Sequence, residues 1–394
     1  MSWETVRLGG FCHKIGSGAT PKGGSTVYIG DGTSLIRSQN VYNLSFEYNG
    51  LTHITKEAAT KLNGVTVYEK DILLNITGDS VARVCMVPTD VLPARVNQHV
   101  AIIRTKENLL PEYLLYYLAN PYMQAYMLNL AVGKGASRNA LTKGMIEDFP
   151  LLLPSFEEQG KIVKYLSVYD DLIENNQKQI KLLEEAAQRL YKEWFVDLRF
   201  PGHENTPIID GIPQGWKEER LVDVADVQYG FAFDGSLFNA DGKGMPIIRI
   251  RNIPDGTTKD YTTEEADEQY IVKNGDIVVG MDGEFHINSW SGEDSYLVQR
   301  TCRIKPHNAD MNGYLLQAIY EPIKFFESTV VGATVAHLGK KHIDTITVLT
   351  APEEIYKPFQ QYFNKRQLLL NQNQRLAEAR DRLLPKLMSG ELEV

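Results

Sequence analysis

The chain of 394 residues has only three cysteines and no long apolar segment. Cys12, Cys85 and Cys302 lie far apart, in or beside apolar runs, so we expect buried free thiols rather than disulfides or a zinc finger. No apolar run approaches the ~20 residues that a transmembrane helix needs, and the N-terminus lacks a basic segment followed by an apolar stretch. We therefore predict a cytoplasmic protein without a membrane partner.

The motifs of common catalytic and nucleotide-binding sites are also absent from the sequence. It has no Gly-x-x-x-x-Gly-Lys-Ser/Thr loop, no strand–Gly-x-Gly–helix unit, and no Cys-x-x-Cys or His-x-x-x-His metal spacing. Gly78-Asp79-Ser80 resembles a hydrolase nucleophile, but its later counterpart, Gly283-Glu284-Phe285, has no serine, which favours a structural turn. Asn120-Pro121-Tyr122 lacks the second proline of an amino-methyltransferase motif and is more simply a helix break. We therefore expect no catalytic residues, no metal site and no bound cofactor in this chain.

An excess of positive charge is missing as well. The chain has 41 lysines and arginines against 50 aspartates and glutamates, a formal net charge of −9, which alone argues against nucleic-acid binding. The balance is uneven, because residues 1–150 hold 14 basic against 12 acidic side chains and residues 215–350 hold 13 against 21. If the chain binds DNA, local loops or a partner protein must neutralise much of the phosphate charge.

What the sequence does contain is an internal duplication. Trp3-x-x-x-Arg7-Leu8 recurs as Trp216-x-x-x-Arg220-Leu221, and further matches follow in the same order. These pair Ile36-Arg37-Ser38-Gln39-Asn40-Val41 with Ile248-Arg249-Ile250-Arg251-Asn252-Ile253, Asp71-Ile72-Leu73-Leu74 with Asp276-Ile277-Val278-Val279, Gln98 with Gln299, Tyr113-Leu114-Leu115 with Tyr314-Leu315-Leu316, and Gly135-Ala136-Ser137 with Gly332-Ala333-Thr334. Each copy consists of short apolar runs broken by Gly, Asn, Asp and Pro, followed by a helical pattern. Both copies are therefore predicted to be small domains dominated by β structure.

A long helical pattern follows each copy. From Ile162 to Trp194 an unbroken heptad seam is apolar except at Asn176, and a similar stripe from Tyr362 to Leu383 has a polar position at Gln372. The first pattern predicts a rod of about 38 residues and ~57 Å. If the two rods pair antiparallel about a pseudo-twofold axis, Asn176 and Gln372 should face each other and set the register. The alternative is that both side chains point to water.

The predicted fold class is α+β, with two β-rich domains separated by two long antiparallel coiled-coil helices in a pseudo-twofold arrangement. The predicted boundaries are 1–152 for the first β-rich domain, 153–200 for the first spacer helix, 201–214 for a linker, 215–351 for the second β-rich domain, and 352–394 for the second spacer helix.

Polar residues suited to reading base edges or binding phosphates recur at matching loop positions of the two copies. Arg, Gln and Asn side chains can pair bidentately with guanine or adenine, and Gly-rich or basic loops can hold phosphates. The predicted DNA-binding residues are Thr20, Lys22, Arg37, Ser38, Gln39, Asn40, Thr77, Gln98, His99, Lys134, Ser137 and Arg138 in the first copy, and Arg249, Arg251, Asn252, Gln299, Arg300, Thr334 and His337 in the second. Each alone could be a solvated loop residue, but their repeated placement favours a binding face.

Along essentially its whole length, the sequence resembles the specificity (S) subunits of type I restriction–modification systems. The most specific motifs are Leu152-Leu153-Pro154-x-x-Glu157-Glu158-Gln159, Tyr191-x-x-Trp194-Phe195-Val196-Asp197, Asn97-Gln98-His99-Val100-Ala101, Gly275-Asp276-Ile277-Val278-Val279 and Arg382-Leu383-Leu384-Pro385-Lys386-Leu387-Met388-Ser389-Gly390. One departure is Pro352-Glu353-Glu354-Ile355, which lacks the glutamine of the first copy.

The resemblance implies that the β-rich domains are target-recognition domains and that the rods are conserved spacers. It implies a non-catalytic subunit that reads an asymmetric, bipartite sequence in double-stranded DNA. Its partners would be two methyltransferase (M) subunits, which use S-adenosylmethionine to methylate one adenine in each half-site, and restriction (R) subunits, which use ATP and Mg. The alternative is a non-catalytic two-domain protein-binding scaffold that does not contact DNA and whose acidic second domain binds a basic partner.

Overall fold

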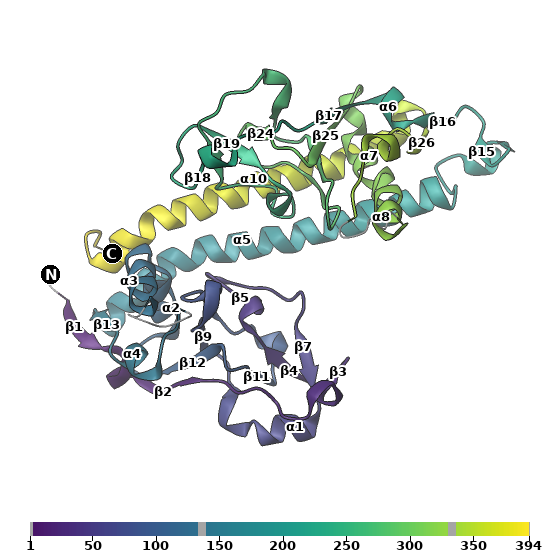
Figure 1. Cartoon of the computed structure of the whole chain (residues 1–394). Helices are drawn as coiled ribbons and strands as arrows, with labels where there is room; N and C mark the ends of the chain where they lie inside the picture. The colour runs from purple at the N-terminus through teal and green to yellow at the C-terminus, as the bar shows by residue number, and fades with distance from the viewer. Residues whose placement is uncertain (1–2, 133–138, 330–335, 394) are drawn as a thin grey trace. The chain divides into compact units, whose positions relative to one another are not determined.

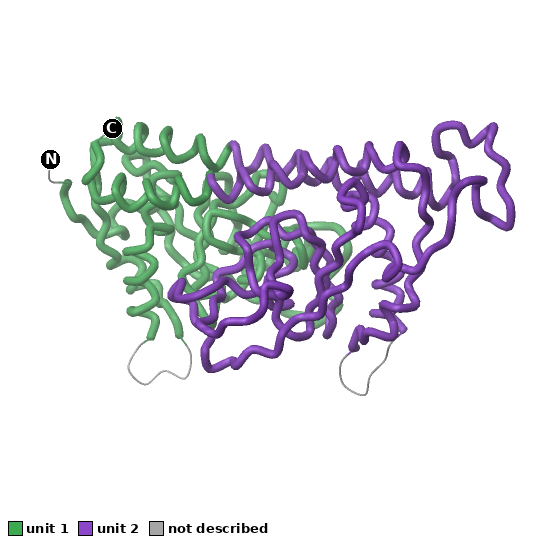
Figure 2. The backbone as a smooth tube through the Cα atoms, turned by 90° about the horizontal axis from the view of Figure 1, so that it is seen from above, with its two compact units in different colours: residues 1–171, 376–394 green, residues 172–375 purple. Residues whose placement is uncertain are grey.

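The computed structural model describes residues 3–132, 139–329 and 336–393, and divides them into two compact units (Figure 2). Unit 1 comprises residues 1–171 and 376–394, and unit 2 comprises residues 172–375. Each unit contains one copy of the repeat. The two long helices, α5 (Phe156–Tyr191) and α10 (Glu353–Ser389), are labelled in Figure 1, and each contributes residues to both units.

Unit 1 is built on two sheets. The first is antiparallel, with the order β10 (Val84–Met86), β9 (Ile72–Asn75), β12 (Val100–Thr105) and β2 (Cys12–Ser17). The second is mixed, with the order β3 (Tyr28–Ile29), β7 (Thr52–Ile54), β4 (Thr33–Ile36), β11 (Ala94–Val96) and β8 (Thr66–Val67). Two short pairs, β1 (Glu4–Arg7) with β13 (Pro150–Leu153) and β5 (Val41–Tyr42) with β6 (Ser45–Phe46), and the helices α1 (Lys56–Lys61), α2 (Pro111–Ala119), α3 (Pro121–Ala131) and α4 (Lys143–Glu147) complete it.

Unit 2 repeats this plan. Its antiparallel sheet has the order β17 (Ala225–Tyr229), β25 (Thr301–Pro306), β22 (Ile277–Gly280) and β23 (Ile287–Ser289). Its mixed sheet has the order β18 (Phe238–Asn239), β20 (Tyr261–Thr262), β19 (Met245–Ile248), β24 (Ser295–Leu297) and β21 (Ile271–Val272). The remaining elements are the pairs β14 (Ile208–Ile209) with β15 (Ile212–Pro213) and β16 (Lys217–Arg220) with β26 (Thr347–Thr350), and the helices α6 (Leu221–Val224), α7 (Asn312–Ala318), α8 (Tyr320–Thr329) and α9 (Lys340–Ile343).

The two copies share both topology and register. In the antiparallel sheets Ile72 pairs with Ile103 as Ile277 pairs with Ile304. Each mixed sheet has one parallel pair, β4 with β11 and β19 with β24. The duplication is thus structural, and the predicted α+β class with two β-rich halves and two long helices is confirmed.

A glycine at the end of the first long strand is required in both copies. A Cβ atom on Gly18 would lie 2.0 Å from the carbonyl oxygen of Val96, and one on Gly230 would lie 2.0 Å from that of Val298. Because a backbone oxygen has no flexible end that can move aside, no other residue fits. Gly18 belongs to the Gly-rich loop in which Thr20 and Lys22 were predicted to contact DNA. Gly18 itself is needed there for the close approach of the loop to the Val96 carbonyl.

The long helices close the cores of both units. Ile162 and Leu166 of α5 and Leu384 and Leu387 of α10 are buried in the core of unit 1. In unit 2 the ring of Phe195, just beyond α5, lies 4.4 Å from that of Tyr314 and 5.7 Å from that of Phe359 on α10 (centroid distances). These contacts explain why both rods carry an apolar stripe.

The three cysteines are buried and unpaired, as the sequence predicts. Burial raises the pKa of each thiol to about 12, so all three are protonated at neutral pH. No helix among the described residues is long and apolar enough to cross a membrane.

The two rods run antiparallel within each unit. In unit 2 Asn176 Nδ2 donates to Asn373 Oδ1 at 2.9 Å, and Glu184, further along α5, pairs with the earlier Arg366 of α10 at 2.6 Å. In unit 1 Asp170 pairs with Arg380 at 2.6 Å. The polar partner of Asn176 is therefore Asn373, and the predicted partner Gln372 is wrong.

Gln372 was predicted because the sequence pattern did not show which side of α10 faces α5. Gln372 is exposed, whereas Phe363, Leu369 and Asn373 lie on the partly or fully buried side of α10. The polar residue Gln367 is also buried, because its side chain bonds to Ser289 of β23 and to the carbonyl of Trp290. A helix that buries two faces, one of them polar, has no unique apolar stripe from which to count.

Replacing Asn176 by leucine should lower the free energy of unfolding by about 1–3 kcal/mol, because the amide of Asn373 then loses its partner within the seam. Replacing both asparagines by leucine should cost less than the sum of the single changes, since no orphaned polar group remains. A double-mutant cycle in denaturant measures this coupling. The exposed Gln372→Leu serves as the control and should change stability by less than about 0.5 kcal/mol. Additive effects of the two asparagine changes would refute the pairing.

Candidate nucleic-acid interface

Four of the predicted residues form one chain of hydrogen bonds in the first copy. The Thr20 hydroxyl, after β2, donates to the side-chain oxygen of Gln98, in the turn between β11 and β12. Gln98 Nε2 and His99 Nε2 are hydrogen-bonded at 3.0 Å, and His99 Nδ1 and the hydroxyl of Thr77, after β9, at 2.6 Å. Three loops that are distant in sequence therefore present a single polar surface, on which Thr20 and Gln98 are exposed.

A hollow of about 540 Å³ lies beside this chain of hydrogen bonds. It is lined by four predicted residues, Ser38, Gln39, Thr77 and His99, and by Tyr42 and Arg83, which were not predicted. The guanidinium carbon of Arg83 lies 4.4 Å from the centroid of the Tyr42 ring. A lone arginine within an apolar run was the available sequence signal for this pair.

Not all of the predicted residues are free to contact DNA. Asn40 is fully buried, and its side chain accepts from the Arg37 backbone N–H at 3.0 Å and donates to the Glu47 carbonyl at 2.9 Å. The predicted base contact of Asn40 is therefore wrong, because its amide closes the turn after β4. Arg37 Nη2 donates to the carbonyl of Gly50 at 2.8 Å, and Gln39 Nε2 to the same oxygen at 3.2 Å.

The second copy uses the same turn. Asn252 accepts from the Arg249 backbone N–H at 2.9 Å, and its amide donates to Asp260 at 3.2 Å. Arg251 forms an ion pair with Asp260 at 2.6 Å. Burial raises the pKa of the Asp260 carboxyl, but hydrogen bonds from Arg251 and Asn252 outweigh it and hold that pKa below its ordinary value. The Arg249 guanidinium lies 5.7 Å from the centroid of the Phe238 ring.

In the second copy, a cluster of Asp282, Arg300 and His337 stands in place of the hydrogen bond that joins Thr77 and His99 in the first copy. His337 Nδ1 lies 2.5 Å from Asp282 Oδ1, and Arg300 Nη1 lies 3.3 Å from Asp282 Oδ2 and 3.2 Å from His337 Nδ1. Asp282 pairs with His337 in an isolated bridge as Thr77 pairs with Ala140, so Asp282 and Thr77 are equivalent. Asp282 was not predicted, because an aspartate among mostly basic and amide candidates has no obvious DNA-binding signature.

Of the remaining predicted residues, Lys22 and Gln299 are exposed. Lys134, Ser137, Arg138 and Thr334 lie outside the described residues. Within the described ranges, no three His, Cys, Asp or Glu side chains are grouped to hold a metal ion.

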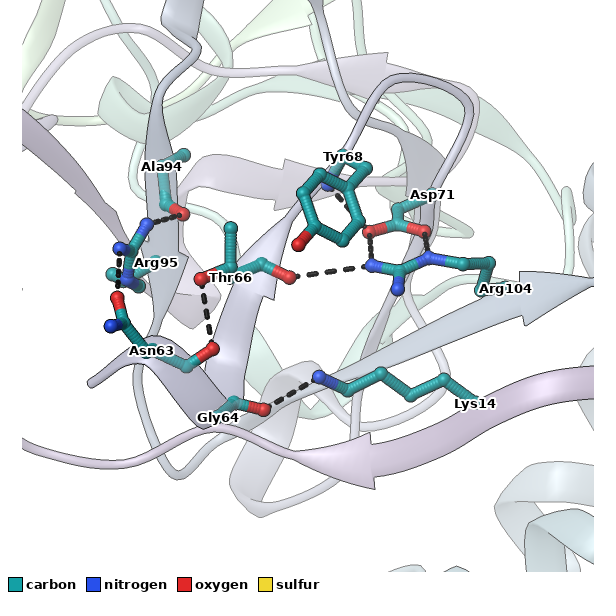
Figure 3. Close-up of polar contacts among 9 residues, drawn as sticks. All are labelled: Lys14, Asn63, Gly64, Thr66, Tyr68, Asp71, Ala94, Arg95 and Arg104. Atoms are coloured by element: carbon teal, nitrogen blue, oxygen red, sulfur yellow. Dashed lines mark hydrogen bonds and ion pairs between the residues drawn. The ribbon is translucent and has the colours of Figure 1, made fainter. Parts of the chain in front are cut away.

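Several cations of unit 1 are committed to internal packing, as Figure 3 shows. Arg104 Nε and Nη2 each lie 2.7 Å from a carboxylate oxygen of Asp71, and its guanidinium stacks 4.2 Å from the Tyr68 ring centroid. Arg95 donates to the carbonyls of Ala59 and Ala94 and to the side chain of Asn63. The positive charge of the first copy is thus only partly available to DNA.

Nearby, Lys14 Nζ donates to the carbonyl of Gly64 at 2.6 Å. Its burial, and then the neighbouring Arg104, lower the pKa of this ammonium, while Asp71 opposes the shift. Lys14 therefore belongs to the same internal network and not to the reading surface.

Comparison with known proteins finds relatives along nearly the whole chain. A family model described as the type I restriction modification DNA specificity domain matches residues 1–185 and 213–378. The type I restriction enzyme MjaIX specificity subunit of Methanocaldococcus jannaschii is 28% identical over 407 residues, which cover 97% of this chain and 91% of that protein. The HindI specificity subunit of Haemophilus influenzae is 22% identical, with coverage of 82% and 86%. A crystal structure of the type I S subunit from M. genitalium has a TM-score of 0.54 at 14% identity, over 98% of this chain and 96% of that one, and so shares the fold.

Proposed function

The chain belongs to the type I restriction modification DNA specificity family, and from that premise we propose that its two β-rich domains read two different half-sites of one bipartite DNA sequence. Sequence specificity is the role of this family, and it agrees with loops that carry polar side chains on a rigid frame. The scaffold alternative is not favoured, since the matches span both copies and their helices.

The observation that carries the proposal is that the same loops hold different chemistry in the two copies. Thr77 and His99 of the first copy correspond to Asp282 and Arg300 of the second. The first group offers a hydroxyl and an imidazole, whereas the second holds the Asp282 carboxylate between the Arg300 guanidinium and the His337 imidazole. A carboxylate accepts from the amino groups of cytosine or adenine, so two such surfaces select different base edges. The target is therefore asymmetric.

Further subunits of the complex would supply the chemistry. We propose two methyltransferase subunits that bind S-adenosylmethionine and methylate one adenine per half-site, and restriction subunits that use ATP and Mg. The acidic balance of residues 215–350 supports this assignment, because DNA phosphates near that domain need cations from elsewhere.

Helix α5, with 36 residues, is ~54 Å long, enough to span a helical turn of DNA (~34 Å).

Co-expression with a type I methyltransferase subunit from the same genome tests the proposal. Sequencing of modified bases should show adenine methylation at one asymmetric, bipartite motif across the host genome. The methyltransferase subunit without this chain is the control and should methylate no defined motif. Methylation that is absent, or that is independent of this chain, would refute the proposed function.

A further inference from the structure

The hollow in the first copy carries a more specific inference, which rests on the proposed function. We propose that Arg83, held against Tyr42, reads a guanine in the half-site recognised by the first domain. Of the described side chains that line the hollow, Arg83 is the only arginine or lysine. The others include Gln39, Thr77 and His99, which are hydrogen-bonding groups of the kind that surround a base edge, and one carboxylate, that of Asp79, which is not paired with Arg83.

No ion pair among the described residues uses the charge of Arg83. Among the described residues Arg83 has no carboxylate partner, whereas Arg104 is paired with Asp71 and Arg95 donates to two carbonyls and an amide. Its stack on Tyr42, a residue that is 41% exposed, orients the guanidinium but uses none of its N–H donors. A guanidinium that is oriented, charged and unpaired is suited to a ligand with two adjacent acceptors, and guanine presents O6 and N7 in the major groove.

The backbone beneath Arg83 is rigidly held. The Arg83 carbonyl accepts from Asn75 N at 2.8 Å, and its N–H donates to the Ser80 carbonyl at 3.2 Å. The preceding Ala82 has φ of 73°, a left-handed conformation that costs a non-glycine residue free energy. Ala82 is held there by its N–H bond to Asn75 O at 2.9 Å and by Gln124 Nε2, which donates to its carbonyl at 2.9 Å. The surrounding hydrogen bonds therefore keep Arg83 at a fixed place in the hollow.

The second copy has no equivalent of the Arg83–Tyr42 pair at these positions. His286 occupies the position of Arg83, since its carbonyl accepts from Gly280 N as that of Arg83 accepts from Asn75 N, both at 2.8 Å. His286 lies 3.6 Å from Glu284, and Pro254 stands where the first copy has Tyr42. At this position, an arginine beside an aromatic residue is thus found in the first copy and not in the second, and so is the guanine that it would read.

The test compares the wild-type chain, Arg83→Ala, Arg83→Lys and Tyr42→Ala, each co-expressed with the methyltransferase subunit. In the methylated motif, Arg83→Ala should relax one G·C position of a single half-site by about 5- to 150-fold, the range for loss of one bidentate contact. Arg83→Lys should not restore the preference, because an ammonium lacks the planar pair of donors. Tyr42→Ala should weaken the same position and leave the other half-site unchanged.

Binding of purified complexes to synthetic DNA duplexes tests which acceptor atom of the guanine Arg83 contacts. Replacing that guanine by 7-deazaguanine removes the N7 acceptor and should weaken binding by wild type but cause no further loss in Arg83→Ala. Thermal unfolding of the Arg83 variants should stay close to that of wild type, since the guanidinium forms no ion pair among the described residues and stacks on a partly exposed ring.

Two results would overturn the proposal while leaving the proposed function intact. One is an unchanged motif in Arg83→Ala. The other is a uniform loss of affinity on all sequences that Arg83→Lys restores, which would make Arg83 a phosphate contact. If the wild-type complex itself methylates no defined motif, the proposed function fails and this inference fails with it.

Discussion

Complexes in which residues 215–350 come from a relative of different specificity are expected to methylate a sequence with only one altered half-site. The two copies have separate cores and separate reading loops, so one can be exchanged without repacking the other. Each mismatched base pair costs about 1–3 kcal/mol, so three changed positions shift the preference by roughly a hundredfold or more. Sequencing of methylated adenines before and after the exchange gives the result directly.

The structure sharpens the design of this exchange. Lys217 pairs with Thr350 across β16 and β26. An exchanged segment whose boundaries lie outside these two residues therefore transfers both strands of the pair together. In the first copy Glu4 pairs with Leu153, so the matched exchange should cover residues 1–153 and should change the other half-site.

The donor domain must also keep its contacts with α10. Arg366 donates to Ser289 at 2.6 Å and to Asn288 at 2.8 Å, and Gln374 donates to the carbonyl of Ser291 at 2.9 Å. A donor that retains these three polar residues should dock on α10 as the native domain does. If either exchange altered both half-sites, the assignment of one domain to one half-site would be wrong.

Asp71→Asn is expected to produce the largest loss of stability among single substitutions in the β-sheet framework of the first domain. The Asp71 carboxylate is fully buried, accepts two bonds from Arg104, and accepts from the Tyr68 backbone N–H at 2.7 Å (Figure 3). Removing its charge leaves a guanidinium that is only 27% exposed without a counter-ion. We expect a loss of about 3 kcal/mol, the lower end of the range for a broken buried pair, measured by denaturant unfolding.

The second copy provides a matched control for this substitution. Asp276 is the equivalent residue, but its nearest cation, Arg303, is 3.9 Å away, and burial raises the pKa of its carboxyl. Asp276→Asn should therefore cost clearly less than Asp71→Asn. The double variant Asp71→Asn/Arg104→Met should recover part of the loss, because both charged partners are gone. Equal losses at Asp71 and Asp276 would contradict this account.

The sequence was most informative where one physical constraint acts twice. Asp71 and Asp276 follow the same turn, and Gly18 and Gly230 each lie against a backbone carbonyl at the end of a neighbouring strand, so each pair survives divergence of the surrounding loops. Short apolar runs bounded by turn formers likewise predicted strands, and the central ones, such as β9 and β22, are buried on both faces.

The candidate DNA-contacting residues were less predictable, because a side chain's type does not say where its hydrogen bonds go. Asn40 has the chemistry to read adenine, but it is buried in a turn. Arg83 and Asp282 became candidates only when the loops around them were placed in space. Exposure and pairing depend on residues that are distant in the chain.

By itself the sequence determined that the protein has two copies of one β-rich domain, that each copy is followed by a long helix, and that the copies differ at their polar loops. Local patterns of apolar residues, glycine and turn formers are sufficient for this, since they act over a few residues. Only the tertiary structure decided that Asn176 meets Asn373 rather than Gln372, and that Arg83 rather than Asn40 faces the hollow. The phase of a two-faced helix and the free or paired state of a charge are set by contacts between distant segments, which no local pattern records.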